Sequence, residues 1–147
     1  MKDTTRRRTG TAVAALLAAD ATLHLYWATG ATWPAPDERA LSLAVLGSEV
    51  SFGPAVVLPL AAITLAGAAG VLAHTRRLGG APARGAARLV TAAVAAGLAV
   101  RGLAGLGWAA GLLDSPPGSP FPTLNLALYT PACLGFGWAA ARLARAR

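Results

Sequence analysis

Residues 11–28 read TAVAALLAADATLHLYWA, an apolar run that carries Asp20 and His24 one helical turn apart. The run is about as long as the roughly 20 residues that a helix needs to cross the hydrocarbon core of a bilayer. A carboxyl group and an imidazole inside such a segment are costly unless they have polar partners. The rest of the chain must therefore supply those partners at the same depth.

The composition of the 147-residue chain points to lipid rather than water as its solvent. Hydrophobic residues make up 55% and charged residues 13%, well below the roughly 25% charge of soluble domains. The net charge is +7, but the basic residues lie between apolar runs and not among aromatic ones, which argues against a nucleic-acid partner.

Cysteine and histidine are too sparse for metal or redox chemistry. Cys133 is the only cysteine, and His24 and His74 lack the spacing of metal ligands, so the sequence predicts no disulfide, no metal site and no other cofactor. Cys133 is expected to be a small packing residue. His74, which stands beside Arg76 in the sequence, is expected to be solvated.

Four apolar runs predict four membrane-spanning helices, at residues 11–29, 55–73, 89–113 and 123–143. The predicted fold is all-α, a single-domain integral membrane four-helix bundle over residues 1–147. A cleaved signal peptide is a weaker interpretation of the first run, because Asp20 and His24 interrupt it and Tyr26-Trp27 suits a membrane interface. A short surface helix is expected at 39–46, and the Pro-rich turn at 114–122 is expected to be non-helical.

The basic residues orient this bundle. The N-terminal segment, the second loop and the C-terminal segment hold four, four and three of them, whereas the first and third loops together hold only Arg39. Cytoplasmic loops are enriched in Lys and Arg, so both termini are predicted to be cytoplasmic. The predicted location is therefore a cell membrane, with the lipid bilayer as the first partner of the chain.

This topology places several polar side chains at similar depth. Asp20 lies about ten residues, or about 15 Å, inside the first span, and His24 lies one turn further out. Arg101 is the middle residue of the 89–113 run. Since Asp20 is the one opposite charge at the depth of Arg101, the sequence predicts a contact between them, direct or through water or His24.

The fourth run completes the predicted site. Asn125, Tyr129 and Cys133 recur every four residues and therefore share one helix face. Pro131 removes a backbone hydrogen bond beside them, and the freed carbonyl must be satisfied by protein or water. We therefore expect a polar pocket that opens outward. Its predicted binding residues are Arg101, Asn125, Tyr129 and Trp27, although Trp27, like Tyr26, Trp33 and Trp108, also suits the role of an interface anchor.

Three segments together resemble one family of small bacterial membrane proteins. They are His24-Leu25-Tyr26-Trp27-Ala28-Thr29-Gly30 followed by Trp33-Pro34, then Arg101-Gly102, then Asn125-x-x-x-Tyr129-Thr130-Pro131-Ala132-Cys133-Leu134-Gly135. In this order they resemble the DUF3995 family of four-span proteins of unknown function, in which an aspartate is more usual at the position of Asn125 and a glycine at that of Ala31. The resemblance implies an integral membrane protein of the bacterial cytoplasmic membrane and supplies no chemistry.

Several functions remain open at this point. The leading hypothesis is a binding or structural membrane protein whose outer pocket takes a small amphipathic or lipid ligand. An enzyme would use His24 as a general acid or base positioned by Asp20, with Arg101 on an anionic head group and Tyr129 donating to a substrate oxygen. A proton-coupled carrier of four spans without an inverted repeat would have to form a homo-oligomer. An Asp20–Arg101 pair that only fixes helix packing is the simplest alternative.

Overall fold

The structure is a computed structural model that describes residues 1–115 and 118–146, and it is all-α over these residues. Four long helical stretches account for most of it. They are α1 (Asp3–Trp27), α3 (Pro54–Arg76), α4 (Ala81–Ala109) and a continuous fourth stretch made of α5 (Phe121–Leu124), the π-helix η1 (Asn125–Tyr129) and α6 (Thr130–Arg145). A short helix, α2 (Glu38–Leu46), lies between α1 and α3. The predicted all-α fold class is confirmed.

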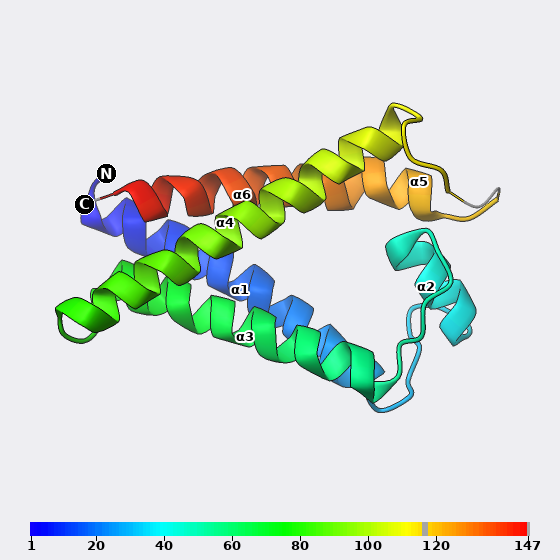
Figure 1. Ribbon diagram of the computed structural model, residues 1–147, viewed down its shortest axis with the longest axis horizontal. Helices are drawn as coiled ribbons and strands as arrows, with labels where there is room; N and C mark the ends of the chain where they lie inside the picture. The colour runs from blue at the N-terminus through cyan, green and yellow to red at the C-terminus, as the bar shows by residue number, and fades with distance from the viewer. Residues whose placement is uncertain (116–117, 147) are drawn as a thin grey trace.

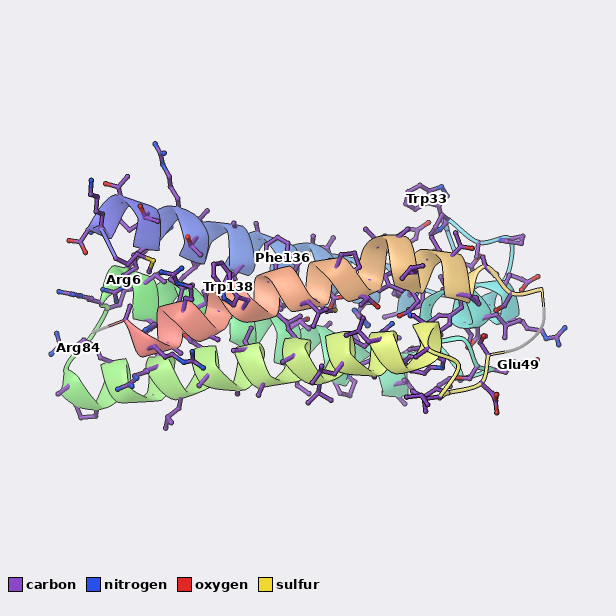
Figure 2. All side chains as sticks on the ribbon, turned by 90° about the horizontal axis from the view of Figure 1, so that it is seen from above. Arg6, Trp33, Glu49, Arg84, Phe136 and Trp138 are labelled. Atoms are coloured by element: carbon purple, nitrogen blue, oxygen red, sulfur yellow. The ribbon has the colours of Figure 1, made fainter. Side chains whose placement is uncertain are left out.

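The long helices form two pairs, α1 with α3 and α4 with α6 (Figure 1). The pairs lie close together at the end that holds both chain termini, and they diverge towards the other end, where α2 packs near α5. Arg6 and Arg84 lie at the first end, which we call the basic end, whereas Trp33 and Glu49 lie at the second, the α2 end (Figure 2). Both termini therefore lie on the same side of the molecule.

Three hydrogen bonds connect the four helices at the basic end. The Arg6 guanidinium donates to the His74 carbonyl at 2.6 Å, and Nε2 of His74 donates to the Leu143 carbonyl at 3.0 Å. Nε of Arg88 donates to the Ala144 carbonyl at 2.9 Å. The expectation that His74 is solvated is wrong: its side chain is buried, because it caps the last turn of α6.

Two helix boundaries differ from the predicted ones for identifiable reasons. α1 begins at Asp3 and not at residue 11, because Arg6 anchors the basic segment to α3 and the Asp3 carboxylate suits the positive end of the helix dipole. α4 begins at Ala81 and ends at Ala109, ahead of residue 113. Gly111, with a φ of 71°, follows in the left-handed region that glycine tolerates best, and it lets the chain leave the helix.

The turn predicted at 114–122 is shorter than expected. Residues 116–117 lie outside the described part of the chain. Phe121 and Pro122 already belong to α5. Pro122 is tolerated there because a first-turn residue has no intrahelical partner for its N–H.

The fourth stretch changes its hydrogen-bond pattern in the middle. Over η1 the chain is a π-helix, and the Thr130 N–H donates to the Asn125 carbonyl. Pro131 follows directly and has no N–H with which to continue an α-helical ladder. A π-turn accommodates one extra residue, and such turns are frequent at functional sites. The irregularity predicted from Pro131 therefore takes the form of a π-helix on its N-terminal side.

α2 corresponds to the short helix predicted at 39–46, and it is fixed at both ends. The Asp37 carboxylate accepts from the Ala40 N–H at 2.7 Å, and Gly47 ends the helix with a φ of 70°. The Glu38 carboxylate accepts from the Phe52 N–H at 2.6 Å, which ties α2 to the segment before α3. The buried apolar cluster at this end contains Trp27, Leu41, Phe52 and Val57.

Two helices are long and apolar enough to cross a membrane. The most apolar windows of α3 and α4 have mean hydropathies of 2.2 and 1.8, and only 28% and 22% of those windows is buried in the protein. α1 begins with charged turns, and α6 has 16 residues when counted without α5 and η1. Length and composition thus give weak support for a membrane location.

The two helix pairs meet where small residues allow close approach. A Cβ added to Gly70 of α3 would collide with the Val90 side chain of α4, and one added to Gly67 would press on Val94. Small residues at such crossings give membrane helices the contact area that a hydrophobic drive supplies in water. Gly70 and Val90 therefore mark a close approach of α3 and α4 that a larger residue at position 70 would disturb.

We expect Gly70→Ala to lower the free energy of unfolding by about 1–3 kcal/mol, the usual effect of overpacking. Gly70→Ala combined with Val90→Ala should regain most of the loss, because the colliding side chain is gone. Gly97→Ala, on an exposed face of α4 with open space around it, is the matched control and should be neutral or slightly stabilising. Thermal unfolding in detergent measures all three, and equal effects of the two single variants would contradict the assignment.

Candidate polar site near the α2 end

Arg101 projects from α4 towards η1 and aromatic side chains. Its Nη1 donates to Oδ1 of Asn125 at 3.2 Å. The guanidinium carbon lies 5.5 Å from the ring centre of Trp108, 5.7 Å from that of Tyr129 and 5.9 Å from that of Phe121. Ring faces at this distance attract a cation. Among the described residues no carboxylate forms an ion pair with Arg101.

Asn125 is the centre of this hydrogen-bond network. It is 1% exposed, and its Oδ1 accepts from Arg101 and from the Thr130 hydroxyl, the latter at 3.2 Å. Its Nδ2 donates to the Gly105 carbonyl at 2.8 Å. Glycine is required at position 105, because a Cβ there would collide with the Thr130 hydroxyl. The side-chain amide thus connects α4, η1 and the start of α6.

Asp20 and His24 form a separate pair on α1. Nδ1 of His24 lies 2.8 Å from the Asp20 carbonyl oxygen and 3.4 Å from the Asp20 carboxylate. A carbonyl oxygen only accepts hydrogen bonds, so in this geometry Nδ1 carries a proton, and in the neutral ring Nε2 is then the unprotonated nitrogen. The Asp20 side chain is 46% exposed and that of His24 is 14% exposed.

The predicted direct contact between Asp20 and Arg101 is wrong. Asp20 pairs with His24 on its own helix, and Arg101 binds Asn125 across to η1. Matching depth did not bring the two charges together, because α1 packs mainly on α3 while α4 packs mainly on α6. Cys133 is partly buried on α6, and the next residue, Leu134, packs against Gly102, which follows Arg101 on α4.

α2 links the two polar clusters. The Tyr129 hydroxyl donates to the Ala44 carbonyl of α2 at 3.3 Å. On the other side Trp27 packs in the buried cluster that includes Leu41 of α2, and its ring lies 5.4 Å from that of His24. The structure thus brings Arg101, Asn125 and Tyr129 together, and it places His24 and Trp27 across α2 from them.

Trp27 is a buried packing residue and is not exposed to a ligand from solvent. It is 6% exposed, and its Nε1 donates to the Trp33 carbonyl at 3.1 Å. Tyr26 and Trp33 are 41% and 67% exposed, as interface anchors would be. Trp108 lies against Phe121, with ring centres 5.1 Å apart.

Four residues of the site were not among the predicted ones. Trp108 lies two turns after Arg101 on the same helix, so helical periodicity could have indicated it. Gly105 and Thr130 carried no such signal, since their role follows from the π-helix. Phe121 is brought in by a loop. Within the described residues no group of His, Cys, Asp and Glu side chains could hold a metal ion.

The comparisons with known proteins leave the activity open. A family model described as "Protein of unknown function (DUF3995)" matches residues 12–140. No curated protein and no solved structure matches the chain. The match covers the Asp20–His24 pair, Arg101 and the Asn125–Tyr129 segment.

Asn125→Leu should lower the free energy of unfolding by about 2–4 kcal/mol, because it leaves buried polar groups of Gly105 and Thr130 without partners. Thr130→Val keeps the shape and removes only one of the three hydrogen bonds, so its effect should be about 1 kcal/mol. Chemical unfolding in detergent compares the two. Equal losses in both variants would show that Asn125 is not the centre of the network.

Proposed function

The chain belongs to the DUF3995 family, and from that premise we propose that it is a multi-pass protein of the bacterial cytoplasmic membrane that binds a small amphipathic or lipid ligand. All four helical stretches cross the bilayer in this proposal, with both termini and the basic end in the cytoplasm. The α2 end then lies on the outer side. Arg101, Asn125 and Tyr129 form the binding site there.

Exposed apolar side chains support four spans. The continuous stretch from Phe121 to Arg145 and the 25-residue α1 both have a length that suits a span. Large apolar side chains face outward on every long stretch, and extensive exposed apolar surface is typical of a membrane or protein contact. They include Leu23 and Leu25 of α1, Leu58 and Ile63 of α3, Val100 and Leu103 of α4, and Leu126 and Leu128 of η1.

The observation that carries the binding proposal is the charge of Arg101. A cation near the bilayer centre is costly and is usually paired with an opposite charge or lines a polar path. Here one amide and three rings hold the guanidinium but do not neutralise it. Among the described residues the guanidinium makes one hydrogen bond, to Asn125, which leaves further N–H donors for a ligand. An anionic head group would satisfy both the charge and these donors.

The aromatic rings around Arg101 suit the apolar part of the same ligand. Trp108, Phe121 and Tyr129 present ring carbons beside the guanidinium. Binding sites for amphipathic molecules combine such apolar walls with a few fixed polar groups. The ligand class that follows is an anionic amphiphile whose head group meets Arg101.

An enzyme is the second candidate, and one observation favours it. The Asp20 carbonyl and carboxylate both lie beside Nδ1 of His24, which leaves Nε2 as a proton acceptor. That is the arrangement in which a histidine acts as a general base. The enzyme requires the bound molecule to reach from Arg101 past α2 to His24. Ligand that is bound by wild type and by His24→Ala, but consumed only by wild type, would establish it.

Topology is testable with the single cysteine of the chain replaced. In a Cys133→Ala background, Ser48→Cys at the α2 end should react with a membrane-impermeant maleimide in intact cells. Thr5→Cys at the basic end should react only after permeabilisation. Both positions are exposed, so accessibility within the fold does not limit labelling. Labelling of both cysteines in intact cells, or the reverse pattern, would overturn the proposed orientation.

Ligand binding near Arg101 should protect Cys133 from alkylation. With dodecyl phosphate as the probe, the rate of modification by N-ethylmaleimide in neutral detergent should fall several-fold, since the probe would cover the space beside Arg101 and Cys133. Dodecyl maltoside, which is uncharged, should not protect. Arg101→Gln should abolish the protection, and Arg101→Lys should keep part of it.

Arg39→Gln is the matched control for this experiment, because it removes one exposed charge of the α2 end away from the site. It should leave protection unchanged. Thermal unfolding checks that each variant is folded. Equal protection in wild type and in folded Arg101→Gln would exclude Arg101 as the binding group.

A further inference from the structure

A cavity lined mainly by basic residues lies at the basic end, at the other end of the helices from the Arg101 site. It has a volume of about 460 Å³ and is lined by side chains from α1, α3, α4 and the turn between α3 and α4. The charged and titratable residues that line it are Arg6, His74, Arg77, Arg84 and Arg88. Among the described residues no acidic side chain lines it, and Asp3 is the acidic residue whose charge reaches Arg6.

Helix capping accounts for only part of this basic cluster. Arg6, His74 and Arg88 each give one donor to a backbone carbonyl near a helix end. Arg6 is 5% exposed, and its Nε is buried without a hydrogen-bond partner. Within the described residues the side chains of Arg77 and Arg84 make no hydrogen bond, and both side chains are exposed. A buried, unpaired guanidinium nitrogen costs free energy unless something occupies the cavity.

The electrostatics of the cavity favour an anion. Burial of the side chain, followed by the nearby charge of Arg77, lowers the pKa of Arg6, yet an arginine remains charged at neutral pH. Arg77 has a φ of 54° at the C-cap of α3, a left-handed position where glycine is usual. An arginine at this position strains the backbone, because a residue with a Cβ disfavours a positive φ. Four guanidinium groups thus face one cavity.

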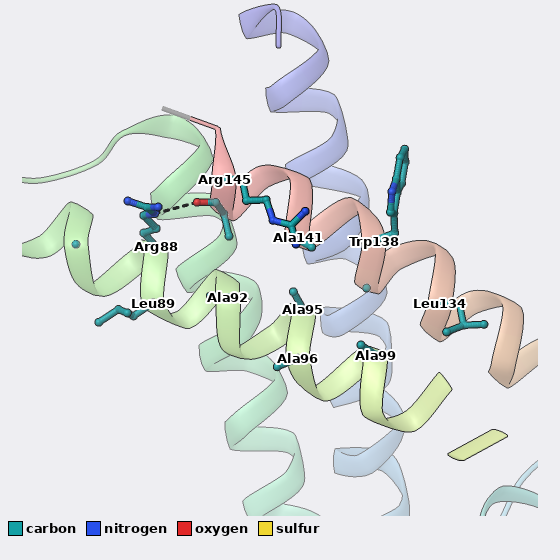
Figure 3. Close-up of a pocket in the computed structure, with 13 residues that line it drawn as sticks. Arg88, Leu89, Ala92, Ala95, Ala96, Ala99, Leu134, Trp138, Ala141 and Arg145 are labelled. Carbon is teal, nitrogen blue, oxygen red and sulfur yellow. Dashed lines mark hydrogen bonds between the residues drawn. The ribbon is translucent and has the colours of Figure 1, made fainter. Parts of the chain in front are cut away.

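An apolar groove continues from this cavity along α4 and α6 (Figure 3). Gly85 and Arg88 line both the cavity and the groove, which has a volume of about 850 Å³. Its lining includes small residues such as Ala92, Ala96 and Ala99, and the larger Leu134 and Trp138. From Arg88 to Ala99 the groove extends about 16 Å at 1.5 Å per residue. Half of a hydrocarbon core is about 15 Å thick.

We propose that cavity and groove together bind one anionic phospholipid of the cytoplasmic leaflet, with its phosphate among Arg77, Arg84 and Arg88 and one acyl chain along the groove. The phosphate would lie beside basic side chains that have no acidic neighbour among the described lining residues. The acyl chain would lie along a groove about as long as one leaflet is thick. Basic pockets between membrane helices on the cytoplasmic side bind anionic lipid head groups elsewhere. The inference rests on the proposed membrane topology and is independent of the Arg101 site.

Native mass spectrometry of the full chain tests this, with phosphatidylglycerol and phosphatidylcholine as probes. One phosphatidylglycerol should remain bound under conditions that remove phosphatidylcholine. Arg77→Gln with Arg84→Gln should reduce retention about tenfold, because two of the basic contacts to the phosphate are lost. Arg7→Gln with Arg8→Gln is the matched control, since it removes the same charge from exposed positions of the basic end outside the cavity. It should change retention twofold or less.

Filling the groove separates a lipid from a free phosphate. Ala96→Phe should lower retention of phosphatidylglycerol and leave the binding of inorganic phosphate unchanged. If inorganic phosphate displaces the lipid and Ala96→Phe has no effect on lipid retention, the site binds a phosphate group and the lipid proposal is overturned. Equal losses in the Arg77/Arg84 and Arg7/Arg8 double variants would also overturn it, since they would reveal unspecific attraction.

The outcome is distinguishable from that of the Arg101 experiments. Arg101→Gln should leave phosphatidylglycerol retention at the basic end unchanged, because the two sites lie at opposite ends of the helices. Loss of retention in Arg101→Gln would contradict a lipid site confined to the basic end. If wild type retains phosphatidylglycerol but dodecyl phosphate does not protect Cys133, the lipid site at the basic end is supported and the proposed Arg101 site is contradicted.

Discussion

Three hydrogen bonds at the basic end hold all four long helices, and the arrangement of the rest follows from them. α1 reaches α3 through Arg6, α3 reaches α6 through His74, and α4 reaches α6 through Arg88. Each bond ends on a carbonyl near a helix C-terminus, where partners within the helix run out. The two arginines also bring positive charge to the negative ends of those helices. With this end fixed, the opposite ends of the two pairs can separate, and α2 occupies the region between them.

The arginine side chains at the two ends of the molecule have different partners. At the basic end the arginines cap helices, and they are more numerous than the carbonyls that they cap. Near the α2 end a single guanidinium is held by an amide and three rings. Neither arrangement neutralises the charge. An ion pair with Asp20 would have done so, and it would have left Arg101 with little attraction for any other anion.

Apolar runs of about 20 residues were enough to predict the four helical stretches, because length and hydrophobicity are properties of contiguous sequence. Depth along those runs also brought Arg101, Asn125 and Tyr129 into one neighbourhood. The predicted contact between Asp20 and Arg101 was wrong, because it also depended on how each helix is rotated about its axis, which depth along the helix does not give. Asp20 had a nearer partner one turn away on its own helix. His74 was misjudged because adjacent arginines suggested solvent, while the carbonyl that it caps comes from a helix end 69 residues away.

Because of the π-helix, the polar site depends on the number of residues between Asn125 and Pro131 as well as on their identity. Each residue of a helix turns the chain by about 100°, and a π-turn holds one residue more than the α-helical count would allow. Asn125 therefore faces Gly105 and Arg101 in a register that differs by one residue from that of α6. A homologue that lacked one residue between Asn125 and Pro131 could keep every side chain named here and still turn its amide away from the guanidinium. Deletion of one residue between Asn125 and Pro131 would therefore disrupt the polar site as much as a substitution of Asn125 itself.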